Sequence, residues 1–437
     1  MTENKVEDEP NRGLLLLCLL AVVAGVSVGF VGGAFRWCLR RADDLRQTIL
    51  DWSHQIPYVG WLVPVALVAL CTVLAVLIVR RVPLAAGSGI QHVEAVARGE
   101  AKPPGLILVP ARFVGGLLAI GSGLVLGREG PTVHMGAAIG AETGRRARLP
   151  ESDVRLLQTS MSGAGLAVAF NAPIGGALFV CEEVTHSFKL RTVLPTMFGV
   201  AVAVGCSRLV IGDRPDFVVD AVPTPQLALL PLFVIFGLLT GLLGICYNHM
   251  ILGMLNTVAR LRRIPSTVAG AAIGAVIGLT LFIDPLAGGG GDPLSQLIVG
   301  GRTFVLPILL LYLVVRFFTG PLSYAAGTPG GLFAPLLAVG ALWGSLFAGL
   351  SSFIPGVDGG LTIAMSLVGM AAFFGAVVRA PFTGIVIVVE MTTVTSALVP
   401  MLAATAAAVL VATLAGSAPI YDSLRLRMLK DQHPQQN

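Results

Sequence analysis

Long apolar runs without a charged side chain constrain this 437-residue chain more than any other feature. A straight helix needs about 20 apolar residues to cross the hydrocarbon core of a bilayer. Runs close to or above that length are Gly13–Phe35, Trp61–Val79, Ser266–Phe282 and Val394–Ile420. Charged residues make up only 12% of the chain, about half the share in soluble domains. We therefore expect an all-α membrane protein, built as a multi-span helical bundle.

Other apolar runs are shorter or are cut by glycine and proline, which is typical of broken or re-entrant helices. Counting all of them gives on the order of ten to fourteen apolar segments. Residues 1–12 are net acidic, the wrong charge for the start of a signal peptide, and are expected to remain as a cytoplasmic segment. Basic residues gather in short polar stretches, which should face the cytoplasm and are not a nucleic-acid surface. These residues are Arg145, Arg146, Arg148, Arg425, Arg427 and Lys430.

The chain contains an internal repeat. Gly127–Pro131 aligns with Gly331–Pro335 at an offset of 204 residues, and in both places a Gly-Ala pair follows. Farther along, Ala-Pro at 172–173 aligns with Ala-Pro at 380–381 at an offset of 208 residues. Glycine and proline could recur by chance in a chain with 53 Gly and 27 Pro, but two collinear matches at nearly one offset argue against chance.

We therefore predict two membrane halves, residues 13–212 and 227–424, joined by a polar linker at 213–226. A cytoplasmic tail would follow at 425–437. Duplicated halves with glycine- and proline-interrupted segments at matching positions are typical of transporter folds. In such folds the substrate site lies where broken helices meet near the middle of the membrane.

Three glycine-rich segments interrupt the apolar sequence, at 86–91, 127–131 and 327–335. Each suits the start of a helix, because glycine allows close backbone approach and proline is tolerated in a first helical turn. Helix N-termini present unpaired N–H groups and a partial positive charge, which favour a small anion. Apart from Arg128 these segments carry no full positive charge, so the ion would be held loosely enough to leave again.

Two side chains in these segments suit ion exchange. Ser88 offers a hydroxyl donor to an anion, although it could equally be an ordinary helix cap. Glu129 is an acid within apolar sequence, and such acids are costly enough to be functional by default. Its carboxylate could occupy the place of an anion and take up a proton when an anion displaces it, which would link the two ions. The alternative is an ion pair with the adjacent Arg128.

Other charged residues in apolar sequence allow a structural interpretation. Glu182 and Glu183 end an apolar run, and the residues alone favour a helix that emerges into water there. Arg379 and Glu390 interrupt another run, would lie on roughly one helix face, and are interpreted as packing or interface residues. Helical di-metal sites need two Glu-x-x-His pairs, and this chain has one, Glu183 with His186. No metal site is therefore predicted.

The sequence resembles the CLC chloride channel/transporter family at three motifs. The family patterns GSGIP, G(K/R)EGP and GxFxP match Gly87–Gln91, Gly127–Pro131 and Gly331–Pro335, in that order. The likeness covers essentially the whole membrane part, and Gln91 departs from it because proline is usual there. It implies a homodimer in the compact prokaryotic form, with two inverted halves and one independent anion pathway in each subunit.

The resemblance also implies the ligands of the anion. A central chloride would be bound by two hydroxyls and two backbone N–H groups, those of Ser88, Tyr421, Leu332 and Phe333. Serine at position 88 goes with a chloride-type member, whereas proline there goes with nitrate preference. We expect chloride as the bound substrate, with no cofactor and no metal.

Two acids are assigned to the proton by the same resemblance. Glu129 resembles the external gate and proton acceptor. Glu183 resembles the internal proton-transfer glutamate, which overrides the interpretation that this acid lies in water. Members with acids at both places are generally antiporters. We therefore predict a secondary active transporter, not an enzyme, that exchanges chloride for protons as a multi-pass protein of the cell (inner) membrane.

Two other interpretations stay open. A passive CLC-type chloride channel, gated by voltage or pH, would move chloride without moving protons. An unrelated intramembrane enzyme would use Glu182, Glu183 and His186, and would contain bound metal.

Overall fold

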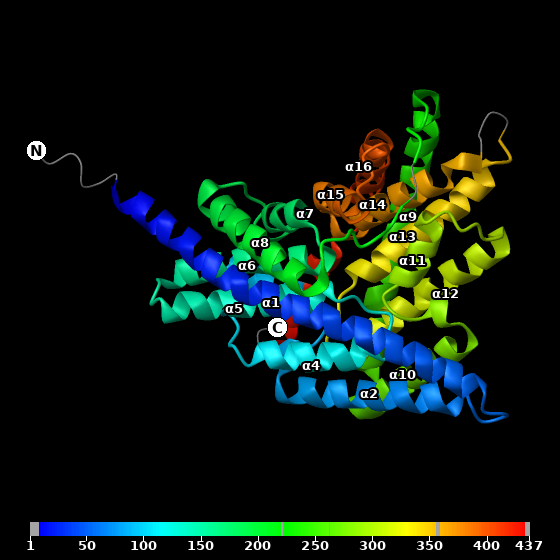
Figure 1. Cartoon of the computed structure of the whole chain (residues 1–437), viewed down its shortest axis with the longest axis horizontal. Coiled ribbons are helices and arrows are strands. Elements are labelled where there is room, and N and C mark those ends of the chain that lie inside the picture. Colours follow the sequence, from blue (N-terminus) through cyan, green and yellow to red (C-terminus); the bar gives the residue numbers. More distant parts are fainter. Residues whose placement is uncertain (1–7, 220–221, 262, 355–358, 433–437) are drawn as a thin grey trace, which may run out of the picture.

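The computed structural model describes residues 8–219, 222–261, 263–354 and 359–432 (Figure 1). Across these residues the chain forms 17 α-helices and no β-strand, apart from two isolated β-bridges. Seven of the described helices are long and apolar enough to cross a membrane, and four shorter ones are also apolar. The prediction of an all-α, multi-span membrane protein is therefore confirmed.

The helices follow one another in the same order in two halves. The first half contains α1 (Asp8–His54), α2 (Leu62–Arg81), α3 (Ile90–Ala97), α4 (Leu108–Gly121), α5 (Glu129–Arg146), α6 (Glu151–Phe170), α7 (Pro173–Phe179) and α8 (Leu190–Ile211). The second contains α9 (Leu230–Arg260), α10 (Ser266–Ile283), α11 (Asp292–Val299), α12 (Leu306–Ala325), α13 (Phe333–Ser351), α14 (Thr362–Val378), α15 (Pro381–Thr392) and α16 (Leu398–Leu414). A last helix, α17 (Ile420–Gln432), follows them.

Matching breaks in the two halves confirm the repeat. The residues Pro-Leu-Ala form a 3-10 turn at Pro83–Ala85 before α3 and again at Pro285–Ala287 before α11. Asn171 ends α6 with φ 51°, Arg379 ends α14 with φ 76°, and an Ala-Pro pair then begins the next helix in each case. Because the chain breaks at Arg379, this residue and Glu390 lie on different helices, and the expectation that they share one helix face is wrong.

Small residues let the helices of each half approach closely. Helix α1 lies along α8 and α9 lies along α16, and this pairing repeats across the two halves. A Cβ placed on Gly25 would lie 2.7 Å from the carbonyl oxygen of Gly199, and one on Gly237 would lie 2.3 Å from that of Ala404. Such contacts are the usual source of helix association in membranes, where lipid removes the hydrophobic driving force between helices.

The helix ends differ from two of the predicted boundaries. Helix α1 begins at Asp8, so it runs through the boundary predicted between residues 12 and 13. Helix α17 runs through the boundary predicted between 424 and 425. Of the predicted end segments, residues 1–7 and 433–437 lie outside the described residues.

Candidate functional site

The three glycine-rich segments come together in the interior of the molecule. As predicted, each begins a helix: α3 starts at Ile90, α5 at Glu129 and α13 at Phe333. Gly127 and Gly331 exchange two backbone hydrogen bonds, with N···O distances of 2.9 and 2.8 Å. The N–H of Gly87 donates to the carbonyl of Thr328 at 3.1 Å. Three helix N-termini from distant parts of the chain therefore meet at one place.

Glu129 occupies this meeting point. Its side chain is fully buried, and its Oε1 accepts the backbone N–H of Phe333 at 2.7 Å. The other oxygen, Oε2, has no hydrogen-bond partner among the described residues. A Cβ on Gly127 would lie 2.0 Å from Oε2, and one on Gly331 would lie 2.0 Å from Oε1. The two glycines therefore make the space in which the carboxylate binds to the start of α13.

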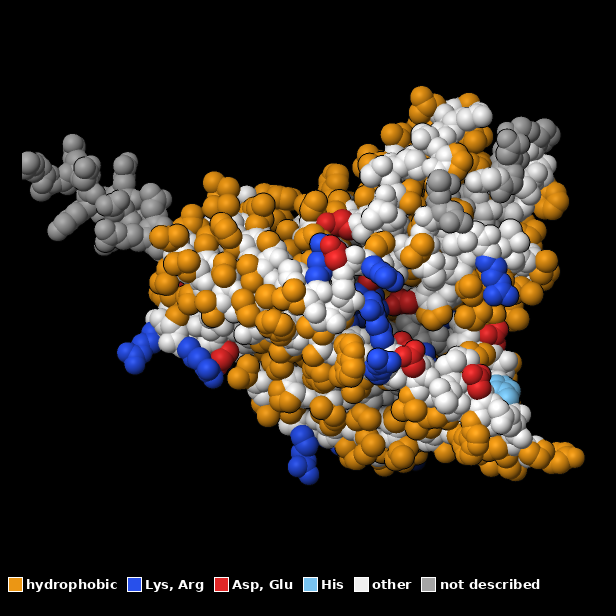
Figure 2. All heavy atoms as spheres, viewed as in Figure 1, with side chains coloured by type: hydrophobic (Ala, Val, Ile, Leu, Met, Phe, Trp, Pro, Cys, Tyr) orange, Lys and Arg blue, Asp and Glu red, His pale blue; other side chains and the backbone are white. Residues whose placement is uncertain are grey.

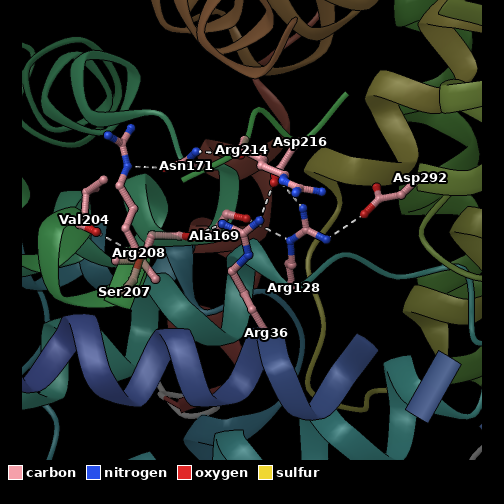
Figure 3. Close-up of polar contacts among 11 residues, drawn as sticks. Arg36, Arg128, Ala169, Asn171, Val204, Ser207, Arg208, Arg214, Asp216 and Asp292 are labelled. Carbon is pink, nitrogen blue, oxygen red and sulfur yellow. Dashed lines mark hydrogen bonds and ion pairs between the residues drawn. The ribbon is translucent and has the colours of Figure 1, made fainter. Parts of the chain in front are cut away.

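The Arg128 side chain points toward Asp216 and Asp292, as Figure 3 shows. Its guanidinium pairs with Asp216 at 2.7 Å and with Asp292 at 2.6 Å. Arg36 of α1 binds the other oxygen of Asp216. The alternative of an ion pair between Glu129 and Arg128 is therefore wrong, because Arg128 is held by acids from two other segments.

Asp216 lies in the stretch between the two halves and is almost completely buried. Burial by itself raises the pKa of this carboxyl group, but the charges of Arg36 and Arg128 outweigh burial, so the pKa lies below its ordinary value. A lowered pKa means that the ionised form stabilises the fold above the ordinary aspartate pKa of about 3.9. That stabilisation is lost as the pH falls through the lower pKa of the folded protein. On the face of the molecule that Figure 2 draws, acidic and basic side chains gather near the middle, among hydrophobic ones.

Asp216→Asn should destabilise the protein by about 3–5 kcal/mol, because it leaves the buried guanidinium of Arg36 without its acidic partner. The measurement is the thermal unfolding midpoint of the purified protein in detergent. Asp213→Asn is the matched control, since Asp213 lies in the same stretch, is 69% exposed and pairs with a surface arginine; its effect should stay within about 0.5 kcal/mol. Equal midpoints for the two variants would contradict a stabilising role for the buried cluster.

Ser88 and Tyr421 place two hydroxyl groups next to each other near Glu129. Both residues are completely buried, and neither hydroxyl oxygen has a hydrogen-bond partner among the described residues. The two hydroxyls approach each other, and Tyr421 lies within electrostatic range of Glu129. The ring of Tyr421 stacks on that of Phe333, with centroids 5.9 Å apart. Because Gly89 is the N-cap of α3 and the Ser88 hydroxyl is unpaired, Ser88 is not the ordinary helix cap.

A buried arginine that the sequence analysis missed holds the Ser88 segment in place. Arg112 of α4 is completely buried, and its Nη1 donates to the carbonyl oxygens of Gly87 at 2.5 Å and Ser88 at 3.2 Å. Arg316 of α12, its counterpart in the second half, donates in the same way to the carbonyl of Gly288 at 2.7 Å. A positive charge thus lies against the Ser88 segment from α4, outside the three glycine-rich segments.

Glu183 is buried, with 5% of its surface exposed, in a π-helical turn at Val180–Val184. The interpretation of a helix that emerges into water is therefore wrong for this residue. Its carboxyl group faces that of Glu94 on α3, which is also buried and has no hydrogen-bond partner among the described residues. Glu94 was missed by the sequence analysis, although an acid in a short apolar helix was a visible signal.

Glu182 and Glu390 have a structural role. Glu182 accepts the backbone N–H groups of Phe382 at 3.0 Å and Thr383 at 2.7 Å, at the start of α15. Glu390 accepts those of Ile174 and Gly175, at 2.9 and 2.7 Å, at the start of α7. Each acid therefore caps a helix of the other half, and Glu390 lies at an interface between the halves, as the interpretation of a packing or interface residue expects. In the part of the chain that the structure describes, no group of three or more His, Cys, Asp or Glu is placed to hold a metal ion.

Residues 71–413 match the family model described as voltage gated chloride channel. The chain is 35% identical over 433 residues to the H(+)/Cl(-) exchange transporter ClcA of Vibrio cholerae serotype O1. This match covers 95% of this chain and 90% of that protein. It is 34% identical over 429 residues to the protein of the same name from Cronobacter sakazakii. That match covers 96% of this chain and 91% of the relative.

A solved structure agrees with these sequence matches. The structure of a slow cyanobacterial Cl-/H+ antiporter superposes on that of this chain with a TM-score of 0.89, at 28% sequence identity. The match covers 95% of this chain and 99% of that chain. The fold of this chain therefore matches that of the antiporter over nearly the whole of both chains.

Proposed function

This chain belongs to the voltage-gated chloride channel family, and we propose that it is a secondary active transporter that exchanges chloride for protons. Its relatives are named as exchange transporters and antiporters, which favours coupled exchange over a passive channel. The observation that carries the proposal is the bond between Glu129 and the N–H of Phe333, where an acid occupies a helix N-terminus suited to an anion.

Glu129 is the proposed external gate and proton acceptor. Chloride and the carboxylate compete for the same N–H groups, because both are anions at one helix end. A carboxylate displaced by chloride loses its partner in a buried place, where a bare charge is costly. Protonation therefore accompanies displacement, and loss of the proton allows the carboxylate to return. This competition is the physical link between the two ions.

The proposed anion site lies beside this gate. Two unpaired buried hydroxyls and two residues at the N-terminal end of α13 support it: Ser88, Tyr421, Leu332 and Phe333. Leu332 is the N-cap of α13 and Phe333 its first residue, so their N–H groups lie at the end of the helix where donors have no partner within the helix. Hydroxyls can rotate to donate to an anion. Arg112 orients the Ser88 segment through its backbone carbonyls and adds a positive charge behind it.

Glu183 is the proposed internal proton-transfer residue. Its carboxyl group is buried beside Glu94 and lies within electrostatic range of Tyr421, close to the proposed anion site. We propose that protons reach it from the face formed by α17. Arg145 and Arg425 both contact the loop at 99–104, on that face, which supports a cytoplasmic location for it.

The remaining assignments follow from the family. We propose a multi-pass protein of the cell (inner) membrane that forms a homodimer, with one pathway in each subunit. The halves at 13–212 and 227–424 and the linker at 213–226 are kept as the proposed units, with α1 and α17 extending past their outer limits. Chloride is the proposed bound substrate, and no cofactor is proposed.

Proteoliposomes that contain the wild-type protein test the function directly. With the voltage clamped by potassium and valinomycin, an outward chloride gradient should drive protons inward against their own gradient. A chloride electrode and a pH electrode follow both ions together, and liposomes without protein are the control. Chloride release without proton movement would identify a passive channel and would overturn the proposed exchange.

A further inference from the structure

A cavity leads from the surface near α17 toward the start of α3. It has a volume of about 390 Å³ and is lined near the surface by Leu255, Arg427 and Asp431. Its deep end is lined by Gln91 and Tyr324. Among the described residues, neither Ser88 nor Tyr421 lines it. The cavity therefore stops just short of the proposed anion site.

Two side chains close the deep end by binding backbone N–H groups of the α3 start. The N–H of Ser88 donates to the hydroxyl of Tyr324 at 3.2 Å. The N–H of Gly89 donates to Oε1 of Gln91 at 3.0 Å. Gly87 has φ 61°, and a Cβ on it would lie 2.9 Å from the Tyr324 hydroxyl and 3.5 Å from Nε2 of Gln91. The two polar side-chain ends therefore lie side by side around Gly87.

These N–H groups are the donors that an anion arriving through the cavity would meet first. Both point from the N-terminal end of α3, where the helix contributes a partial positive charge. The acceptors that hold them now are uncharged oxygens, and hydrogen bonds to a charged acceptor are about twice as strong as those to a neutral one. An anion can therefore replace these oxygens, but it must first break the bonds that they make.

We propose that Tyr324 and Gln91 form an inner cap, which holds the N–H groups of Ser88 and Gly89 until chloride from the cavity displaces it. The inner cap thereby sets the chloride affinity and the turnover from this face; this inference rests on the proposed exchange function. Gln91 is the position at which the first motif departs from the usual proline. A proline side chain has no hydrogen-bond acceptor, so this half of the inner cap depends on the residue particular to this chain.

Tyr324→Phe and Gln91→Met test the inner cap, because each keeps the approximate size of the side chain and removes the acceptor. Freeing one N–H from a competing neutral bond should tighten chloride binding about fivefold. Isothermal titration of the full-length protein in detergent with chloride gives the dissociation constant of each variant. Tyr312→Phe is the matched control, since Tyr312 lies on the same helix α12 and its hydroxyl binds Asp284, away from the cavity. The control should bind chloride as the wild type does.

Flux measurements separate a cap from a merely structural role. In proteoliposomes both variants should reach half-maximal chloride flux at a lower chloride concentration, with the ratio of protons to chloride unchanged. Chloride affinities within about twofold of wild type in both folded variants would overturn the inner cap. If Tyr324→Phe fails to fold, Gln91→Met decides the question alone. Wild-type protein that moves no protons would overturn the exchange function, whereas the calorimetry would still test the inner cap.

Discussion

Proteoliposomes that contain Glu129→Gln should release chloride with proton movement reduced to background. Glutamine fits the space between Gly127 and Gly331 because it is nearly the same size, but it cannot ionise. It should therefore resemble the protonated, displaced gate at all pH values, and the chloride flux should lose most of its pH dependence. Paired chloride and pH electrodes, under the clamped voltage used for the wild type, measure both effects.

Glu142→Gln is the matched control for the external gate. Glu142 lies on the same helix α5, near its opposite end, where it pairs with Arg145 at 3.0 Å and Arg146 at 2.9 Å. Its loss should leave proton coupling intact, because surface ion pairs of this kind contribute little. Uphill proton movement that persisted in Glu129→Gln would contradict the mechanism, since no ionisable group would then remain at the start of α13 to exchange with chloride.

The helix starts at the site could be predicted because their signals are local. Glycine permits the unusual backbone angles and close approaches found before a helix, and proline suits a first helical turn, so the glycine-rich segments predicted the starts of α3, α5 and α13. The repeat was also visible, since it needs only a constant offset between similar segments. The same offset of 204 residues also pairs Arg112 with Arg316, two arginines within apolar sequence.

Side-chain partners could not be predicted, because they come from distant segments. Arg128 binds Asp216 and Asp292, which lie 88 and 164 residues away in the sequence. The adjacent Glu129 was the natural partner to expect, yet Glu129 binds the N–H of Phe333, and Arg128 binds the two aspartates (Figure 3).

The burial of Glu183 was hidden for the same reason. A helix end is exposed or covered according to the elements that pack on it, and α3 contacts the turn that carries this acid. The proposed inner cap could not be predicted either, because Tyr324 approaches Gln91 from α12 in the other half.

Proteoliposomes that contain Glu183→Gln should continue to move chloride but should lose uphill proton movement. The residue lies beside Glu94 and near Asp422 of α17, and it is not one of the groups proposed to bind chloride, so chloride flux should not need its charge. A proton that travels between that face and Glu129 does need a buried group that can accept and release it, and glutamine cannot do so. The same paired electrodes measure the result.

Glu182→Gln is the matched comparison, which tests whether the proton passes through Glu183 or through its neighbour. The two acids are neighbours in one π-helical turn, but Glu182 binds the N–H groups of Phe382 and Thr383, whereas Glu183 faces Glu94. A glutamine at 182 retains a carbonyl oxygen for α15, so coupled exchange should survive there with at most a loss of stability. If instead Glu183→Gln kept its coupling and Glu182→Gln lost it, the proton would pass through the acid that caps α15, and the assignment to Glu183 would be wrong.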